Sequence, residues 1–215
     1  MSFCLQVAGD GDVFPMLAIY APYVRDTAIT FEYEVPTAAE FGARLHHVLP
    51  EYPWLVCRAP GQVLGYAYAH RHMERAAYGW NVECSVYVLG SARGRGVGRA
   101  LYGALLELLR LQGVVNAYGC IAVPNEPSEA LHRATGFSLL GHFPASGSGA
   151  PPPERRRKEP RRVHARNQRL YRRGHTGRIP FRYARFRKAE HDLFAAQAGG
   201  VRRLRVHQPA DAERD

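Results

Sequence analysis

The feature that most constrains this 215-residue chain is a glycine-rich turn, Arg93–Gly98, which stands between two regular elements. The segment Val82–Val88 before it has the composition of a strand, and Arg99–Gln112 after it has the periodicity of an amphipathic helix. A glycine-rich turn that opens a helix directs unpaired backbone N–H groups at one point, where the helix dipole favours an anion. Three arginines in and just after the turn add positive charge. The sequence therefore predicts a pyrophosphate-binding cradle. It lacks the Gly-Lys-Ser/Thr ending of a Walker loop and the spacing of the dinucleotide fingerprint.

The apolar pattern along the first two thirds of the chain alternates between helical and strand-like periods. Predicted helices cover residues 13–24, 37–49, 99–112 and 125–136, and predicted strands cover residues 54–57, 62–69, 81–88, 117–123 and 137–143. We expect Pro22 to end the first helix early. Helices followed by a hairpin, and then by strand–helix–strand–helix–strand, favour a mixed α/β fold.

Charge divides the chain into two unlike parts. Residues 1–150 hold 10 Arg, no Lys and 12 acidic residues (10 − 12 = −2), whereas residues 151–215 hold 19 basic and 7 acidic residues (19 − 7 = +12). The first part lacks the basic footprint of a nucleic-acid binder. Beyond Pro144 the composition becomes rich in Pro, Gly, Ser and then Arg, so we predict a domain over residues 1–144 and a largely disordered basic tail over 145–215.

The cysteines and histidines give no metal signature. The four cysteines lie far apart in the sequence, and the histidines at 46, 47, 70 and 72 have no ligand spacing, so we assign no metal. Free thiols are typical of a reducing cytoplasm, and we find neither a secretory leader nor an apolar run long enough to span a membrane. We therefore expect a cytoplasmic protein.

Seven short blocks around the cradle resemble the Gcn5-related N-acetyltransferase (GNAT) superfamily. Its acetyl-CoA signature, Arg/Gln-x-x-Gly-x-Gly/Ala, corresponds here to Arg93–Gly98. The other blocks are similar to the phosphinothricin and methionine sulfoximine acetyltransferase branch, and they occur in order between residues 4 and 143: Thr30–Glu32, Tyr52–Val56, Gly65–Ala69, Tyr78–Glu83, Ser85–Val88, Pro124–Ser128 and Leu131–Phe137. The resemblance implies a mainly antiparallel sheet flanked by helices.

The same resemblance implies transfer of an acetyl group from acetyl-CoA to the amine of a small amino-acid-like substrate. The backbone of Val86, Tyr87 and Val88 would pair with the pantetheine arm like an added strand, Gly94–Arg99 would hold the pyrophosphate, and Asn125 would bond the arm from the other side. The implied cofactor residues are Val86, Tyr87, Val88, Arg93, Gly94, Arg95, Gly96, Val97, Gly98, Arg99, Asn125 and Ser128.

Two residues are candidates for proton transfer. Glu83 occupies the strand position at which the family has its general base, directly or through a water; the alternative is a structural carboxylate paired with an arginine. His132 follows Asn125 by seven residues, where many members of the superfamily have a tyrosine that protonates the thiolate. A neutral imidazole serves as acid or base near pH 7, but a histidine on a helix face is also a common packing residue.

A substrate that bears a carboxylate and a phosphinate or sulfoximine group needs fixed cations. The resemblance implies a substrate side made of Phe31, Arg75, Tyr78, Glu83, Cys84 and Ser85. For Arg75 the alternative is a solvated loop arginine, and Phe31 fits a core position equally well.

The sequence departs from the family after residue 145, where the expected last strand pair, with its Gly-x-Lys-x-Gly-x-Trp-x-Asp pattern, has no counterpart. Three interpretations remain open: a shifted reading frame, a basic appendage that binds nucleic acid or an acidic surface on a degenerate acetyltransferase body, and an inert tail. Without those strands we expect an exposed sheet edge, lower stability and impaired activity. Relatives commonly dimerise, and the sequence leaves a homodimer open.

Overall fold

The structure is a computed structural model that describes residues 2–148 and 178–187. The described strands are β1 (Cys4–Val7), β2 (Trp54–Ala59), β3 (Gln62–Arg71), β4 (Asn81–Val88), β5 (Asn116–Ala122), β6 (Ser138–Ser148) and β7 (Arg178–Arg187). The α-helices are α1 (Val13–Asp26), α2 (Ala38–Val48), α3 (Val97–Leu111) and α4 (Glu126–Ala134), with short 3-10 turns at Asp10–Asp12, Ala76–Tyr78 and Gly90–Ala92. The mixed α/β class expected from the sequence is confirmed.

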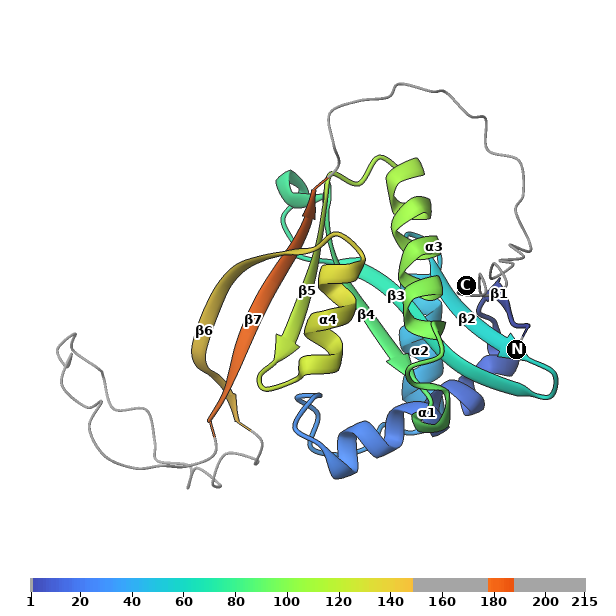
Figure 1. Cartoon of the computed structure of the whole chain (residues 1–215). Helices are drawn as coiled ribbons and strands as arrows, with labels where there is room; N and C mark the ends of the chain where they lie inside the picture. Colours follow the sequence, from blue (N-terminus) through green and yellow to red (C-terminus); the bar gives the residue numbers. More distant parts are fainter. Residues whose placement is uncertain (1, 149–177, 188–215) are drawn as a thin grey trace, which may run out of the picture.

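The described strands form a single sheet in the order β1-β2-β3-β4-β5-β7-β6, with helices on both faces (Figure 1). Neighbouring strands are antiparallel except β4 and β5, which run parallel. One core lies between the sheet and α3, around Leu101, Leu105 and Leu109. The other lies between the sheet and the α1–α2 pair, around Met16, Leu45 and Trp54. The sheet is therefore buried on both faces at β2, β3 and β4, the strands that support the candidate site.

The parallel pair β4 and β5 separates after a short contact. Its register joins Asn81 to Asn116, Val82 to Ala117 and Glu83 to Tyr118, and ends there. Cys84–Val88 continues along β3 on its other side. A gap therefore opens in the sheet directly after Glu83, between the second halves of β4 and β5.

The first helix differs from the sequence prediction, because α1 continues through Pro22 to Asp26. Proline removes one helical N–H, so the last turn needs support from elsewhere. That support is tertiary: the Tyr23 hydroxyl donates to the Val88 carbonyl at 2.6 Å, and Val24 is buried. The sequence analysis also did not predict β1, which pairs with β2 from Cys4 to Val7.

The far end of the sheet also differs from the sequence expectation. β6 extends past residue 144 to Ser148, and β7 (Arg178–Arg187) lies between β5 and β6, pairing with both. Alternate residues Ile179, Phe181 and Tyr183 give this segment the period of a strand. β5 is therefore not an edge strand, contrary to the exposed edge we expected. The domain limit at 144 and the origin of residues 145–215 stay predictions, because 149–177 and 188–215 lie outside the described residues.

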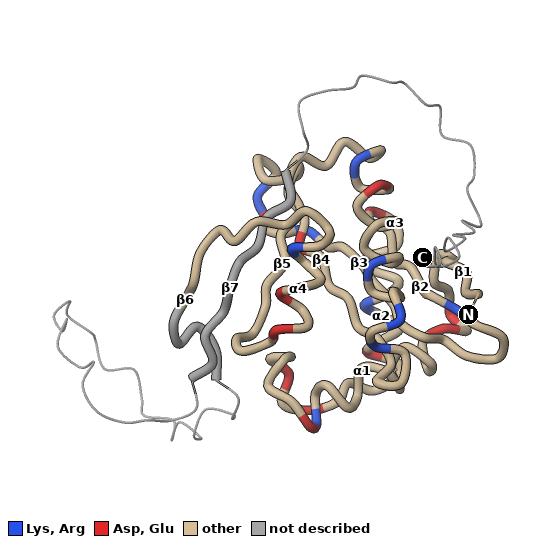
Figure 2. Tube along the Cα trace, in the orientation of Figure 1, with Lys and Arg blue, Asp and Glu red and all other residues tan. Residues whose placement is uncertain are grey.

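Acidic and basic residues are interspersed along the described chain in the view of Figure 2 rather than gathered on one face. Within the residues that the structure describes, no helix is both long and apolar enough to cross a membrane.

Candidate active site

The glycine-rich turn folds as a cradle at the start of α3. Gly94 and Gly96 have φ values of 71° and 80°, in the left-handed region that side chains with a Cβ rarely adopt, and Gly96 is the N-cap of α3. The first N–H groups of a helix have no partner inside it, so those of α3 face outward beside the turn. Close packing brings α3 to this position: a Cβ on Gly65 of β3 would meet the Tyr87 carbonyl oxygen at 2.8 Å and Val97 at 3.2 Å.

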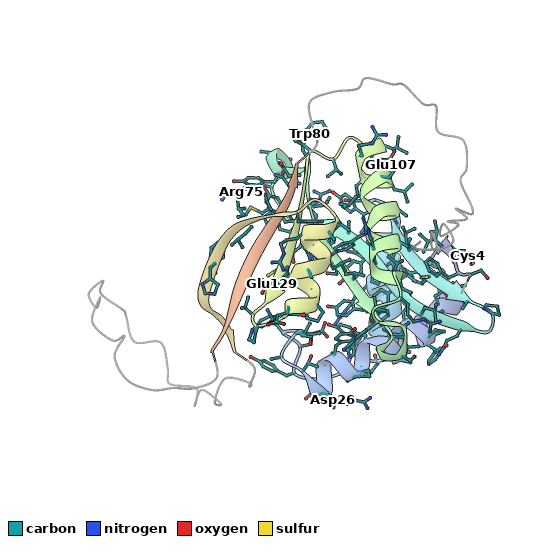
Figure 3. All side chains as sticks on the ribbon, viewed as in Figure 1. Cys4, Asp26, Arg75, Trp80, Glu107 and Glu129 are labelled. Carbon is teal, nitrogen blue, oxygen red and sulfur yellow. The ribbon has the colours of Figure 1, made fainter. Side chains whose placement is uncertain are left out.

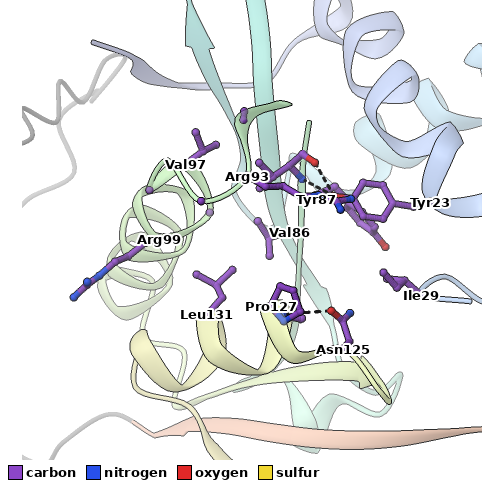
Figure 4. Close-up of a pocket in the computed structure, with 16 residues that line it drawn as sticks. Tyr23, Ile29, Val86, Tyr87, Arg93, Val97, Arg99, Asn125, Pro127 and Leu131 are labelled. Carbon is purple, nitrogen blue, oxygen red and sulfur yellow. Dashed lines mark hydrogen bonds between the residues drawn. The ribbon is translucent and has the colours of Figure 1, made fainter. Parts of the chain in front are cut away.

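A cavity of about 330 Å³ lies in front of the cradle (Figure 4). Tyr23, Ile29 and Asn125 flank it on one side, and Val97 and Leu131 on the other, while the Arg99 side chain extends away from it. The predicted cofactor residues that line it are Val86, Tyr87, Val88, Arg93, Gly94, Gly96, Val97, Gly98, Arg99, Asn125 and Ser128. Arg95 of the predicted set is not among its lining residues, and its guanidinium lies 3.5 Å from the Ser91 carbonyl oxygen. Arg93 instead lies over the Tyr23 ring, 5.1 Å from its centroid.

The backbone of β4 offers polar groups to the gap between β4 and β5. The Tyr23 hydroxyl donates to the Val88 carbonyl and accepts from the Val88 N–H, and the Cys84 carbonyl oxygen lies 3.3 Å from the Tyr102 hydroxyl, so these groups point away from β3. Residues two apart on a strand point the same way, so the Val86 N–H and carbonyl also face the gap. Tyr87 takes its place in the β3 ladder opposite Tyr66. Of the three residues predicted to pair with a pantetheine arm, Val86 thus has the open backbone geometry.

His132 is 4% exposed and lines a cavity of about 60 Å³ with Cys84, Ser85 and Tyr102. Its Nδ1 lies 2.8 Å from the Ser128 carbonyl oxygen, so Nδ1 donates and Nε2 accepts from the Tyr102 hydroxyl at 3.1 Å. Burial lowers the pKa of His132 and raises that of Tyr102, so both are neutral near pH 7.

The backbone around His132 makes room for its ring. Asn125 caps α4, accepting from the Ser128 N–H at 3.3 Å, which fixes the turn that bonds Nδ1. On β5, a Cβ at Gly119 would come within 2.4 Å of His132 Nε2. The imidazole is therefore held from three sides by α4, α3 and β5.

Glu83 lies on the opposite face of the sheet from His132. Side chains alternate along β4, so Cys84 and Val86 face α3 while Glu83, Ser85 and Tyr87 face the α1–α2 side. Glu83 Oε2 lies 3.5 Å from Nδ1 of His72, and both side chains are mostly covered. Among the described side chains the one within salt-bridge distance of Glu83 is thus a histidine, whereas the alternative predicted from the sequence was an arginine. The two proton-transfer candidates flank the gap from its two sides.

The remaining predicted substrate residues are spread along β4 and the loops beside it. Cys84 and Ser85 line the smaller cavity, where burial raises the pKa of the Cys84 thiol and Ser85 bonds the Tyr68 hydroxyl. Arg75 and Tyr78 precede β4 and are exposed; Figure 3 shows Arg75 and Trp80 at that end, far from Asp26 of α1. Phe31 is half-buried in the α1–α2 connection. Among the cavities lined by described residues, the smaller one joins Cys84 and Ser85 to the gap, and none is lined by Arg75, Tyr78 or Phe31.

Sequence reasoning missed four residues at the site, namely Tyr23, Ile29, His72 and Tyr102. Ile29 lines both cavities and directly precedes the family-like block that begins at Thr30. Tyr102 belongs to the apolar face of α3, so the sequence pattern does not distinguish it from a core residue. His72 lies in no sequence motif that points to Glu83. A test for polar residues on the buried face of α3 would have found Tyr102. Within the described residues no cluster of three or more His, Cys, Asp or Glu side chains has the arrangement of a metal site.

A helix N-terminus that faces a cavity where two parallel strands part, with a carboxylate and a buried histidine at the gap, is the arrangement of an acyl-CoA-dependent acetyltransferase. Residues 5–147 match the family described as an acetyltransferase (GNAT) domain, and the chain belongs to this family.

Its relatives include phosphinothricin N-acetyltransferase of Streptomyces viridochromogenes, 34% identical over 143 residues that cover 66% of this chain and 78% of the relative. L-methionine sulfoximine/L-methionine sulfone acetyltransferase of Pseudomonas paraeruginosa is 39% identical over 152 residues, which cover 68% and 87%. Among solved structures, a phosphinothricin acetyltransferase from Sinorhizobium meliloti in complex with acetyl-CoA matches with a TM-score of 0.72 and 27% identity, covering 93% of this chain and 95% of that one. The chain is an acetyltransferase related to these enzymes.

Proposed function

We propose that the protein transfers the acetyl group of acetyl-CoA to the amine of a small amino-acid-like substrate of the phosphinothricin or methionine sulfoximine type. The observation that carries the proposal is the gap after Glu83, with the cradle of α3 at one end and titratable groups on both faces. Two curated relatives act, by their names, on phosphinothricin and on methionine sulfoximine, which supports the substrate class.

The pyrophosphate of acetyl-CoA would bind at the turn Gly94–Gly98 and the N-terminus of α3. Both left-handed glycines let the backbone approach an anion closely, and the dipole of the 15-residue helix favours negative charge there. The pantetheine arm would pair with the Val86 backbone, with Asn125 on the other side of the cavity. For the Val88 backbone to join this pairing, the Tyr23 hydroxyl would have to leave it.

In the proposed reaction, proton transfer takes place on both sides of the gap. Glu83 takes the proton of the substrate ammonium, directly or through a water, and the freed amine attacks the thioester carbonyl carbon. The C–S bond then breaks, the thiolate takes a proton from the His132–Tyr102 pair, and the attacking nitrogen releases its second proton to solvent, from which the pair is reprotonated. Because Nε2 of His132 accepts from Tyr102 in this structure, the pair delivers its proton from the tyrosine hydroxyl, and His132 stabilises that hydroxyl.

The acceptor substrate would be recognised by four residues, Phe31, Arg75, Tyr78 and Ser85. Ser85 is on the same face of β4 as Glu83, which supports its role. Arg75 supplies a cation for the acceptor carboxylate, for which the exposed β3–β4 loop would close toward the gap. A cytoplasmic location is part of the proposal and is supported by the four free cysteines.

The test is acetyl-CoA consumption by the full chain, assayed against phosphinothricin, methionine sulfoximine, methionine sulfone and the standard amino acids. We expect turnover with phosphinothricin, methionine sulfoximine and methionine sulfone. Glu83→Gln should lower kcat about 100-fold or more and leave acetyl-CoA binding unchanged. Turnover retained in Glu83→Gln would remove Glu83 from its role. Acetyl-CoA binding without any turnover, together with salt-sensitive binding of nucleic acid, would favour the degenerate scaffold with a basic tail instead.

A further inference from the structure

His72, which directly follows β3, lies close to Glu83 of β4 and Tyr118 of β5. The β3–β4 ladder pairs His70 directly with Glu83, and the His72 N–H continues the ladder to the Asn81 carbonyl at 3.3 Å. His72 is therefore the diagonal neighbour of Glu83 on the same face of the sheet, within reach of a long side chain.

The ring of His72 is held in place by β5. It stacks on Tyr118 with centroids 4.4 Å apart and an interplanar angle of 24°. Tyr118 is the register partner of Glu83 and belongs to the last β4–β5 pair before the gap. The stacked ring thus has a fixed orientation at the point where the strands separate.

That orientation places Nδ1 of His72 beside the Glu83 carboxylate. The distance to Oε2 is 3.5 Å, and only 13% of the His72 side chain and 23% of the Glu83 side chain are exposed. This is longer than a strong N–H···O bond of about 2.9 Å, and such contacts at catalytic bases commonly tighten when substrate binds.

A glutamate on a strand has three rotatable bonds and loses proton-transfer efficiency when its carboxylate is misplaced by about 1 Å. Among the described side chains, His72 is the one that lies within salt-bridge distance of the Glu83 carboxylate. We infer that His72 is a positioning residue, which clamps the Glu83 carboxylate between the Tyr118 ring and the gap so that it meets the acceptor amine. The inference rests on the proposed role of Glu83 as general base.

Two substitutions separate the ring from its nitrogen. His72→Phe keeps a planar ring to stack on Tyr118 and removes Nδ1, whereas His72→Asn removes the ring and leaves an amide nitrogen near the Nδ1 position. We expect His72→Phe to lower kcat about 10-fold while the KM for acetyl-CoA and the melting temperature stay unchanged. His72→Asn should keep more of the wild-type kcat than His72→Phe does. His70→Phe, at the position directly opposite Glu83, is the matched control and should keep wild-type kcat, because the His70 ring bonds its neighbouring Arg71 carbonyl instead.

A double-mutant cycle with Glu83→Gln completes the experiment. Residues that act as a unit are not additive, so His72→Phe should lower kcat no further in the Glu83→Gln background. Wild-type kcat in His72→Phe, with Glu83→Gln inactive, would overturn the positioning role alone. A His72→Phe effect of equal size in both backgrounds would overturn it as well. Full activity in Glu83→Gln would overturn the role of Glu83 as base and the positioning role with it, whereas a wild-type chain without turnover would overturn the proposed function.

Discussion

At the scale of single residues, the site depends on positions where a side chain is absent. Gly119 of β5 faces the His132 ring, and an added Cβ would lie 2.4 Å from Nε2 and 2.7 Å from Cδ2. The ring has no easy retreat, because Tyr102 and the Ser128 carbonyl hold its two nitrogens. A methyl group at this position therefore displaces the ring and tests the catalytic geometry without removing any polar atom.

We predict that Gly119→Ala lowers kcat about 100-fold, since a displacement of about 1 Å at a reacting group has an effect of that order. Gly103→Ala is the control, because a Cβ there meets nothing within 4 Å. Steady-state kinetics and thermal melting of both variants check the prediction. Equal kcat values in the two variants would show that the position of His132 does not matter for turnover.

The buried His132 should also make the free energy of unfolding depend on pH. Burial lowers its pKa from the ordinary value of 6.5, so between the lowered pKa and 6.5 the unfolded chain binds a proton that the folded chain does not. The free energy of unfolding should therefore rise with pH through that window and become flat above it. His132→Gln removes this contribution, and urea titrations at a series of pH values should show a smaller rise for the variant. An identical slope in both proteins would contradict the assigned neutral state.

At the scale of elements, the sequence predicted the strand, turn and helix of the cradle with limits within about two residues, because each has a strong local signal. Gly94 and Gly96 mark the turn, and the leucines of α3 mark its buried face. Features that depend on tertiary contacts were not predictable in this way. The last turn of α1 survives Pro22 because Tyr23 bonds a distant strand, and no local pattern contains that bond.

The same limit applies to the site. Glu83, Asn125 and His132 could be assigned from motif spacing, but their partners could not. His72 reaches Glu83 only through the β3–β4 register, and Tyr102 reaches His132 only because α3 crosses the sheet beside α4. The strand β7 was hidden for a different reason. Its arginines at 178, 182, 185 and 187 resemble the charged sequence around it and mask the apolar alternation.

The helix α3 packs closely against β3 at Gly65, and this contact can be tested by substitution. A Cβ at Gly65 would approach the Tyr87 carbonyl at 2.8 Å and Leu101 at 3.3 Å, so either the strand or the helix must move. Gly65→Ala should lower the free energy of unfolding by about 1–3 kcal/mol and weaken acetyl-CoA binding, because the cradle moves with α3. Gly42→Ala in α2, whose Cβ would have ordinary contacts of 3.7 Å with Val13, is the control. Melting curves and calorimetric titration with acetyl-CoA provide both measurements, and unchanged affinity in Gly65→Ala would contradict the coupling.

At the scale of the whole molecule, β7 joins the part of the sheet within residues 5–147, which match the acetyltransferase family, to the last third of the chain. It pairs with β5 from Asn116 to Ala122 and with β6 over nearly its whole length. A chain that ends after Ser148 would leave β5 as an open edge beside the gap and β6 without its described partner. Open edges with unpaired backbone groups favour association between chains.

We therefore predict that a chain ending after Ser148 melts at least about 5 °C below the full chain and associates on concentration, because it loses both ladders of a ten-residue strand. A chain ending after Arg187 retains β7 and should keep the melting temperature and monodispersity of the full chain. Both are measured by thermal melting and by light scattering on a sizing column. If residues 178–187 take no part in the sheet in solution, the two truncated chains will melt together. That outcome would restore the interpretation in which the whole stretch after residue 145 is an addition without a role in the fold.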